Sequence, residues 1–211
     1  MPNRDSSMKT AQDEARTPRQ NVLVQTGDIV DRGPNSLELV RYFERLKEQA
    51  REAGGQVYTL LGNHEAMNLL GQYQYVNRAE LTRLGLQPVK QPLLGAQQPK
   101  KLPLELGLQR WHELMQPGSE TGDLLLSRPT AVVLGSGACR TLFVHGGLVP
   151  ELLDLASQGE ASASTPEALL AQLNVLMQGA LRKCAGTAGC PRSAPEFDFL
   201  YGPYSPIWYR G

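Results

Sequence analysis

Carboxylate, amide and imidazole side chains recur in this sequence at the ends of short apolar segments. Asp28, the adjacent pair Asn63 and His64, and His145 each stand beside a glycine at such an end. Glycine lets the backbone turn sharply and lets a ligand approach closely. A carboxylate can bridge two divalent ions about 3.5–4 Å apart, while imidazole and amide groups complete their coordination shells. Two such ions lower the pKa of a shared water, so these residue types predict a hydroxide nucleophile near neutral pH.

A strand, a helix and a second strand must position the first two of these groups. Residues 22–24 and 57–61 are short apolar runs that predict two buried strands. Between them, Asn35 and Glu38 have the spacing of a capping box, and apolar residues recur every three positions from Leu37 to Leu46. This pattern predicts a βαβ unit. The carboxyl ends of parallel strands are where α/β proteins bind their ligands.

The second half of the sequence has a weaker pattern. Residues 77–128 contain several prolines, which predicts a loop-rich insertion with one short helix at 106–115. A hairpin is expected over 131–134 and 141–144, and it leads directly into His145. A further helix is expected from Thr165, with a proline in its first turn.

Length and composition indicate one globular domain, over residues 21–211, behind a disordered tail at 1–20. The 21 acidic and 21 basic residues balance, which argues against nucleic acid and membrane partners. No pattern indicates an oligomeric state. Of the three cysteines, Cys184 and Cys190 flank a glycine-containing loop. Free thiols are the favoured interpretation, with a local disulfide as the alternative.

Three ordered motifs give the sequence a family resemblance. Residues 27–33 (GDIVDRG), 62–65 (GNHE) and 145–148 (HGGL) resemble the signature of the phosphoprotein phosphatases, which are calcineurin-like metallophosphoesterases. Residues 61–69 (LGNHEAMNL) and 208–211 (WYRG) resemble the Shewanella-like branch of that family more closely. The resemblance implies an α/β fold, namely a metallophosphoesterase β-sandwich flanked by helices in four layers.

The resemblance also implies the roles of the site residues. Asp28 would bridge two divalent metal ions (manganese, iron or zinc), and Asn63 and His145 would bind the second one. His64 would be the general acid that protonates the leaving group, held and kept charged by Asp31.

Two arginines complete the implied site. Arg32 and Arg210 would hold the phosphate oxygens, because a guanidinium suits a tetrahedral dianion. A salt bridge between Arg32 and Asp31 is the structural alternative. The implied reaction is in-line attack of metal-bound hydroxide on a phosphomonoester of a phosphoprotein substrate, in a serine/threonine-type protein phosphatase.

The sequence departs from the family pattern at both ends. The family has a Gly-Asp-x-His-Gly motif before the Asp28 segment, and residues 1–20 contain neither that motif nor a histidine. A further family histidine would follow Gly211, where the sequence stops. The first metal would therefore keep only Asp28. The expectation is a phosphoesterase domain truncated at both ends.

Other functions remain compatible with these motifs. A diadenosine tetraphosphate hydrolase, or another small-molecule phosphoesterase, shares them. An inactive phosphate-binding pseudophosphatase would keep His64, Arg32 and Arg210, and a truncated gene product of an active enzyme would have the same internal motifs. Cytoplasm and plastid are the compartments most compatible with the resemblance.

Overall fold

The computed structural model of the protein describes residues 21–88, 102–157, 165–185 and 190–211. The expected tail at 1–20 lies outside these residues. The described chain forms, in order, β1 (Val22–Gln25), α1 (Ser36–Glu52), β2 (Gln56–Thr59), α2 (Asn63–Leu69), α3 (Arg78–Leu86), α4 (Pro103–Met115), α5 (Glu120–Leu126), β3 (Ala131–Leu134), the 3-10 turn η1 (Gly137–Cys139), β4 (Thr141–Val144), α6 (Pro150–Ser157), α7 (Pro166–Cys184) and α8 (Pro195–Tyr201).

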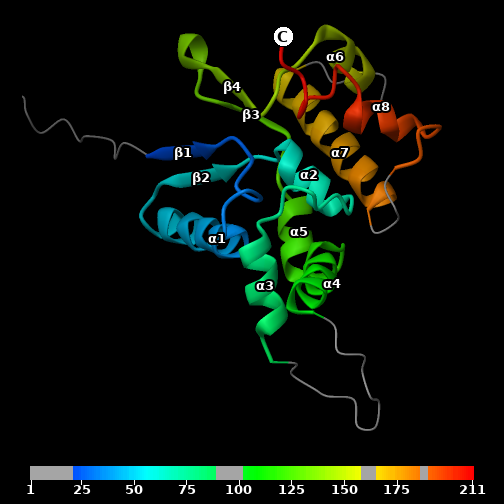
Figure 1. The fold of residues 1–211 in the computed structure, drawn as a ribbon. Coiled ribbons are helices and arrows are strands. Elements are labelled where there is room, and N and C mark those ends of the chain that lie inside the picture. The colour runs from blue at the N-terminus through cyan, green and yellow to red at the C-terminus, as the bar shows by residue number, and fades with distance from the viewer. Residues whose placement is uncertain (1–20, 89–101, 158–164, 186–189) are drawn as a thin grey trace, which may run out of the picture.

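The predicted βαβ unit is present. β1 and β2 pair in parallel, with Val22 opposite Gln56 and Gln25 opposite Thr59, and α1 connects them (Figure 1). The prediction that β1 is buried is wrong, because Val22 is 47% exposed and Leu23 is 47% exposed. Within the described residues, β2 is the strand paired with β1.

The start of α1 is capped from a distant segment rather than by its own capping box. Asn35 occupies the N-cap position without a side-chain cap hydrogen bond, and its Oδ1 lies 3.4 Å from Arg83 Nη2. The backbone N–H groups of Ser36 and Leu37 donate to the carboxylate of Glu80, each over 3.1 Å. Glu80 lies on α3, which therefore fixes the N-terminus of α1.

The prediction of a loop-rich insertion at 77–128 is corrected by α3, α4 and α5, which occupy most of the described part of it. The prolines suggested loops, but a proline can also begin a helix. Pro103 lies in the first turn of α4, where its fixed φ and missing N–H suit a helix start. Asn77 caps α3 by accepting from Ala79 N, and Ser119 caps α5 by accepting from Gly122 N. The predicted helix at 106–115 is the larger part of α4.

The helices α3 and α4 pack closely because each contributes a glycine to the contact. A Cβ atom added to Gly85 would overlap the carbonyl of Pro103, and one added to Gly107 would overlap the carbonyl of Leu81. The larger hydrophobic core continues from this contact to α2, α5, α7 and the residues around α8. Its fully buried members include Trp111, Met115, Leu125, Leu126, Met177 and Leu181.

The predicted hairpin and the predicted long helix of the second half are confirmed. β3 and β4 pair antiparallel, with Ala131 opposite Val144, and α7 begins at Pro166 after the cap residue Thr165. A hydrogen bond connects the segment after β2 to the segment before β3: Leu61 N donates to Pro129 O over 2.9 Å. In the part of the chain that the structure describes, no helix is long and apolar enough to cross a membrane.

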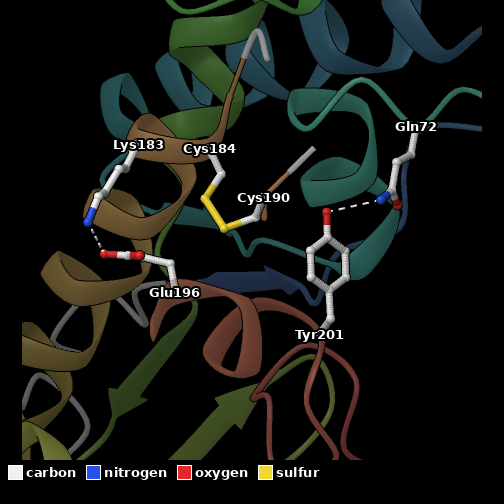
Figure 2. The surroundings of a disulfide bond; sticks show 6 residues. All are labelled: Gln72, Lys183, Cys184, Cys190, Glu196 and Tyr201. Atoms are coloured by element: carbon white, nitrogen blue, oxygen red, sulfur yellow. Dashed lines mark hydrogen bonds and ion pairs between the residues drawn. A yellow bond between two sulfur atoms is a disulfide. The ribbon is translucent and has the colours of Figure 1, made fainter. Parts of the chain in front are cut away.

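A disulfide joins the end of α7 to the segment before α8. Figure 2 shows the bond between Cys184 and Cys190, both buried, so the favoured interpretation of free thiols is wrong. The same figure shows Lys183 on α7 paired with Glu196 on α8, at 2.6 Å. Two connections therefore hold α8 against α7.

The segment after α8 reaches back to the hairpin. The N–H of Gly146 donates to the carbonyl of Pro206 over 2.9 Å. Tyr201, at the end of α8, accepts a hydrogen bond of 3.0 Å from Gln72, just after α2 (Figure 2). These contacts connect the segment after β4 and the segment after α2 to the C-terminal part of the chain.

The α3–α4 contact yields a stability test with an internal control. Gly107→Ala should destabilise the chain by about 2–3 kcal/mol, because the methyl group must displace backbone rather than a flexible side chain. Gly179→Ala, on the exposed side of α7 with nothing within 4 Å, should leave stability unchanged or raise it by up to about 1 kcal/mol. Urea unfolding of both variants measures the difference, and equal midpoints would contradict the described contact.

Candidate functional site

The segment that follows β1 has an unusual backbone. Asp28, Asp31 and Arg32 have positive φ angles of 61°, 72° and 58°. Residues other than glycine rarely adopt this left-handed conformation, which costs of order 1–3 kcal/mol each and concentrates at functional sites. Surrounding contacts must therefore hold the segment, and they orient two carboxylates and a guanidinium that the sequence had singled out.

Glu65 is the main support of this segment. Its carboxylate accepts from the N–H groups of Asp28 (2.7 Å), Ile29 (2.8 Å) and Val30 (3.2 Å). It also accepts from Gly62 N over 2.8 Å, so one side chain joins the segments after β1 and β2. Glu65 is fully buried. The sequence motif predicts a carboxylate here, and the structure shows it to be a strut.

Asp28, Asn63 and His145 lie close together in the structure. His145 Nε2 lies 2.8 Å from Asn63 Oδ1 and 3.5 Å from Asp28 Oδ1. His145 Nδ1 donates to the carbonyl of Thr26 over 2.8 Å, since a carbonyl oxygen can only accept. In the neutral imidazole, Nε2 therefore presents its lone pair to two oxygen atoms.

This donor set suits a divalent cation. Three electron-pair donors converge, one carboxylate, one amide oxygen and one imidazole nitrogen, and a cation between them relieves their mutual repulsion. Gly62 leaves the space that this arrangement needs, because a Cβ atom there would overlap Asp28 Oδ1. Within the described ranges, no group of three or more His, Cys, Asp or Glu side chains is placed to hold a metal, so Asn63 is an essential part of this set.

His64 and Asp31 form a buried pair beside the cluster. His64 Nδ1 lies 2.7 Å from Asp31 Oδ2, and the two side chains are 4% and 0% exposed. The backbone N–H of His64 donates to Asp28 Oδ1 over 3.1 Å, which links the pair to the donor cluster. The structure thus brings together five of the seven residues that the sequence singled out.

A further pair of residues extends this pair into the core. Asn68 Nδ2 donates to Asp31 Oδ1 over 2.9 Å, and the indole N–H of Trp111 donates to Asn68 Oδ1 over 2.7 Å. Asn68 lies within the sequence motif that follows His64. Trp111 lies on α4, and no sequence signal connected it to this site.

Arg32 and Arg210 are placed differently. Arg32 is exposed, and its guanidinium lies 5.8 Å from the centre of the Tyr75 ring. The Tyr75 ring meets the His64 ring edge-on, with 5.1 Å between the ring centres. Arg32 is therefore at the rim of the site, and Asp31 pairs with His64 rather than with Arg32. Arg210 is exposed, and the hydrogen bond of its guanidinium goes to the carbonyl of Tyr209. The described contacts do not bring Arg210 to Arg32.

Arg128 is a buried charge that the sequence patterns did not reveal. Its Nη1 lies 3.8 Å from Glu65 Oε1, and both side chains are 0% exposed. In the described part of the chain its guanidinium nitrogens have no hydrogen-bond partner. Burial lowers the pKa of Arg128, while the charges of Glu65 and Glu44 act in the opposite direction. Arg128 therefore compensates the buried charge of Glu65.

An α/β fold with metal donors at strand ends, next to a buried histidine–aspartate pair, is typical of metallophosphoesterases. A sequence model described as calcineurin-like phosphoesterase matches residues 2–177. The chain belongs to this family.

Curated relatives and solved structures agree with that membership. An uncharacterized protein of Schizosaccharomyces pombe is 36% identical over 90% of this chain and 46% of its own length. Shewanella-like protein phosphatase 2 of Arabidopsis thaliana is 28% identical over 63% of this chain and 39% of its own length. The crystal structure of a cold-active protein-tyrosine phosphatase of a psychrophilic Shewanella is 26% identical, with a TM-score of 0.62, over 90% of this chain and 46% of that one. The chain spans less than half the length of these relatives.

The buried pair of Glu65 and Arg128 can be tested by unfolding the metal-free chain. Glu65→Gln and Arg128→Met should each cost about 3–5 kcal/mol, because each leaves an uncompensated buried charge or unmatched donors. The double variant should cost clearly less than the sum, since it removes both charges.

Arg110→Met is the matched control for this cycle. Arg110 donates to the carbonyls of Leu84 and Gln87 and has no contact with Glu65 among the described residues. Its effect should add to that of Glu65→Gln within about 0.5 kcal/mol. If the costs of Arg128→Met and Glu65→Gln are also additive, the two side chains, 3.8 Å apart, are not energetically coupled.

Proposed function

We propose that this protein is a metal-dependent phosphomonoester hydrolase that acts on phosphoproteins. The observation that carries the proposal is the convergence of Asp28, Asn63 and His145 beside the buried pair of His64 and Asp31. The names of the Arabidopsis relative and of the Shewanella structure, both protein phosphatases, support a phosphoprotein substrate.

Asp28, Asn63 and His145 would hold a divalent ion, for which manganese, iron and zinc are the candidates. When bound, such an ion lowers the pKa of water and polarises a phosphoryl oxygen. For a two-metal site of the family's kind, Asp28 would be the shared carboxylate, and the donors described here account for the second metal only. Their mixed oxygen and nitrogen chemistry fits all three candidates.

The protein residues would orient the substrate and move a proton. Asp31 accepts from His64 Nδ1, which leaves Nε2 as the nitrogen that can deliver a proton to the leaving oxygen. Arg32, exposed at the rim, would bind phosphate oxygens through its guanidinium. Arg210 would join it only if the C-terminal segment moved toward the site.

Hydrolysis of phenyl phosphate, whose leaving group needs a proton, tests this proposal on the 211-residue chain with added manganese. His64→Asn should lower kcat by about 10²–10⁴, the usual contribution of a positioned general acid. Asp28→Asn should remove both turnover and bound manganese, measured by elemental analysis. His112→Asn, the same substitution on an exposed face of α4, should leave kcat unchanged.

Equal rates for His64→Asn and His112→Asn would contradict the proposed acid. Phosphoserine, phosphothreonine and phosphotyrosine peptides, compared with diadenosine tetraphosphate, test the substrate class. A higher kcat/KM for the dinucleotide than for every peptide would replace the phosphoprotein proposal with a small-molecule one.

A further inference from the structure

A continuous line of buried hydrogen bonds connects α4 to His64. Trp111 donates to Asn68 over 2.7 Å, Asn68 donates to Asp31 over 2.9 Å, and His64 Nδ1 meets Asp31 over 2.7 Å. Each of these four residues is at most 6% exposed. Buried polar groups of this kind have strict geometric requirements, because a partner lost to rotation is not replaced by water.

Groups that can only donate or only accept fix the direction of every bond in this line. An indole N–H can only donate, so the atom of Asn68 that faces it is the oxygen. The amide nitrogen of Asn68 must then face Asp31 Oδ1 and the carbonyl of His64, to which it donates over 2.9 Å each. The Asp31 carboxylate can only accept, so its Oδ2 accepts from the N–H at His64 Nδ1. This bond fixes the ring orientation of His64.

We infer that Trp111 and Asn68 are positioning residues for His64. Among the described contacts they reach Asp31 and the carbonyl of His64 but not the donor cluster, and they hold His64 so that Nε2 can serve the proposed leaving group. The catalytic meaning of this inference rests on the proposed function, whereas the connection itself does not. Trp111 also fills the core, so the packing of its ring must be separated from its N–H.

The connection can be tested by NMR on the metal-free chain, because the sequence has two tryptophans and three histidines. Asp31→Asn should shift the indole N–H resonance of Trp111 and leave that of Trp208 in place. Asp28→Asn is the matched control. It makes the same change three positions away, and Asp28 has no hydrogen bond to Asn68 or Trp111 among the described residues.

The reciprocal measurement follows the ring nitrogens of His64. Trp111→Phe keeps most of the apolar ring but removes the donor, and it should shift the His64 ¹⁵N signals, because Asn68 and Asp31 then hold His64 Nδ1 less firmly. Met115→Ala, one turn further along α4 and equally buried, should lower thermal stability without shifting them. If Trp111→Phe moves the His64 signals no more than Met115→Ala does, or if Asp31→Asn leaves the Trp111 indole signal unmoved, the inference is overturned.

Kinetics then test what the positioning does. Trp111→Phe should lower kcat on a phosphoserine peptide by about tenfold, with KM and bound manganese unchanged. The loss should be much smaller on 2,4-dinitrophenyl phosphate, whose leaving group needs no proton. An equal loss on both substrates would overturn the link to His64. A wild-type chain without any turnover would count against the proposed function, and the spectra alone would then decide the inference.

Discussion

The carboxylate of Glu65 is the constraint on which the site depends. It collects four backbone N–H groups from the segments after β1 and β2, and it does so without exposure to water. Carboxylate–amide bonds are stronger than neutral ones, and here they oppose the cost of the left-handed backbone at Asp28. The strained backbone and the buried charge therefore depend on each other. The loop provides the N–H donors that offset the burial of the Glu65 carboxylate, and the carboxylate holds the loop in its left-handed conformation.

The same short helix carries the strut and the chemistry. All seven residues of α2 are buried, and they include Asn63, His64, Glu65 and Asn68. Asn63 turns toward the donor cluster, Glu65 toward the backbone of the Asp28 segment, and Asn68 one turn later toward Asp31. Because these side chains share a rigid backbone, an error in the placement of one would move the others, and the helix sets their mutual distances.

Sequence patterns predicted the parts of this arrangement that are local. The strands, α1 and α7 follow from periodicity and turn residues, whereas the three motifs were identified by their resemblance to a family. The patterns failed where a partner comes from far along the chain. Trp111 lies 43 residues from Asn68, and Glu80 lies 44 residues from the N–H of Ser36 that it caps. A local pattern of apolar and polar residues has no information on such pairings, which depend on how helices pack.

These distant partners share one origin, the helical segment that the sequence suggested was a loop-rich insertion. From it, Asn77 donates to the carbonyl of Arg32, Glu80 caps α1, Trp111 reaches Asn68, and Arg128 approaches Glu65. Each contact ends on the loop after β1, at the start of α1 or on α2. α3 and α4 pack closely against each other. Through these contacts, the described helices of this segment support the strained loop and α2.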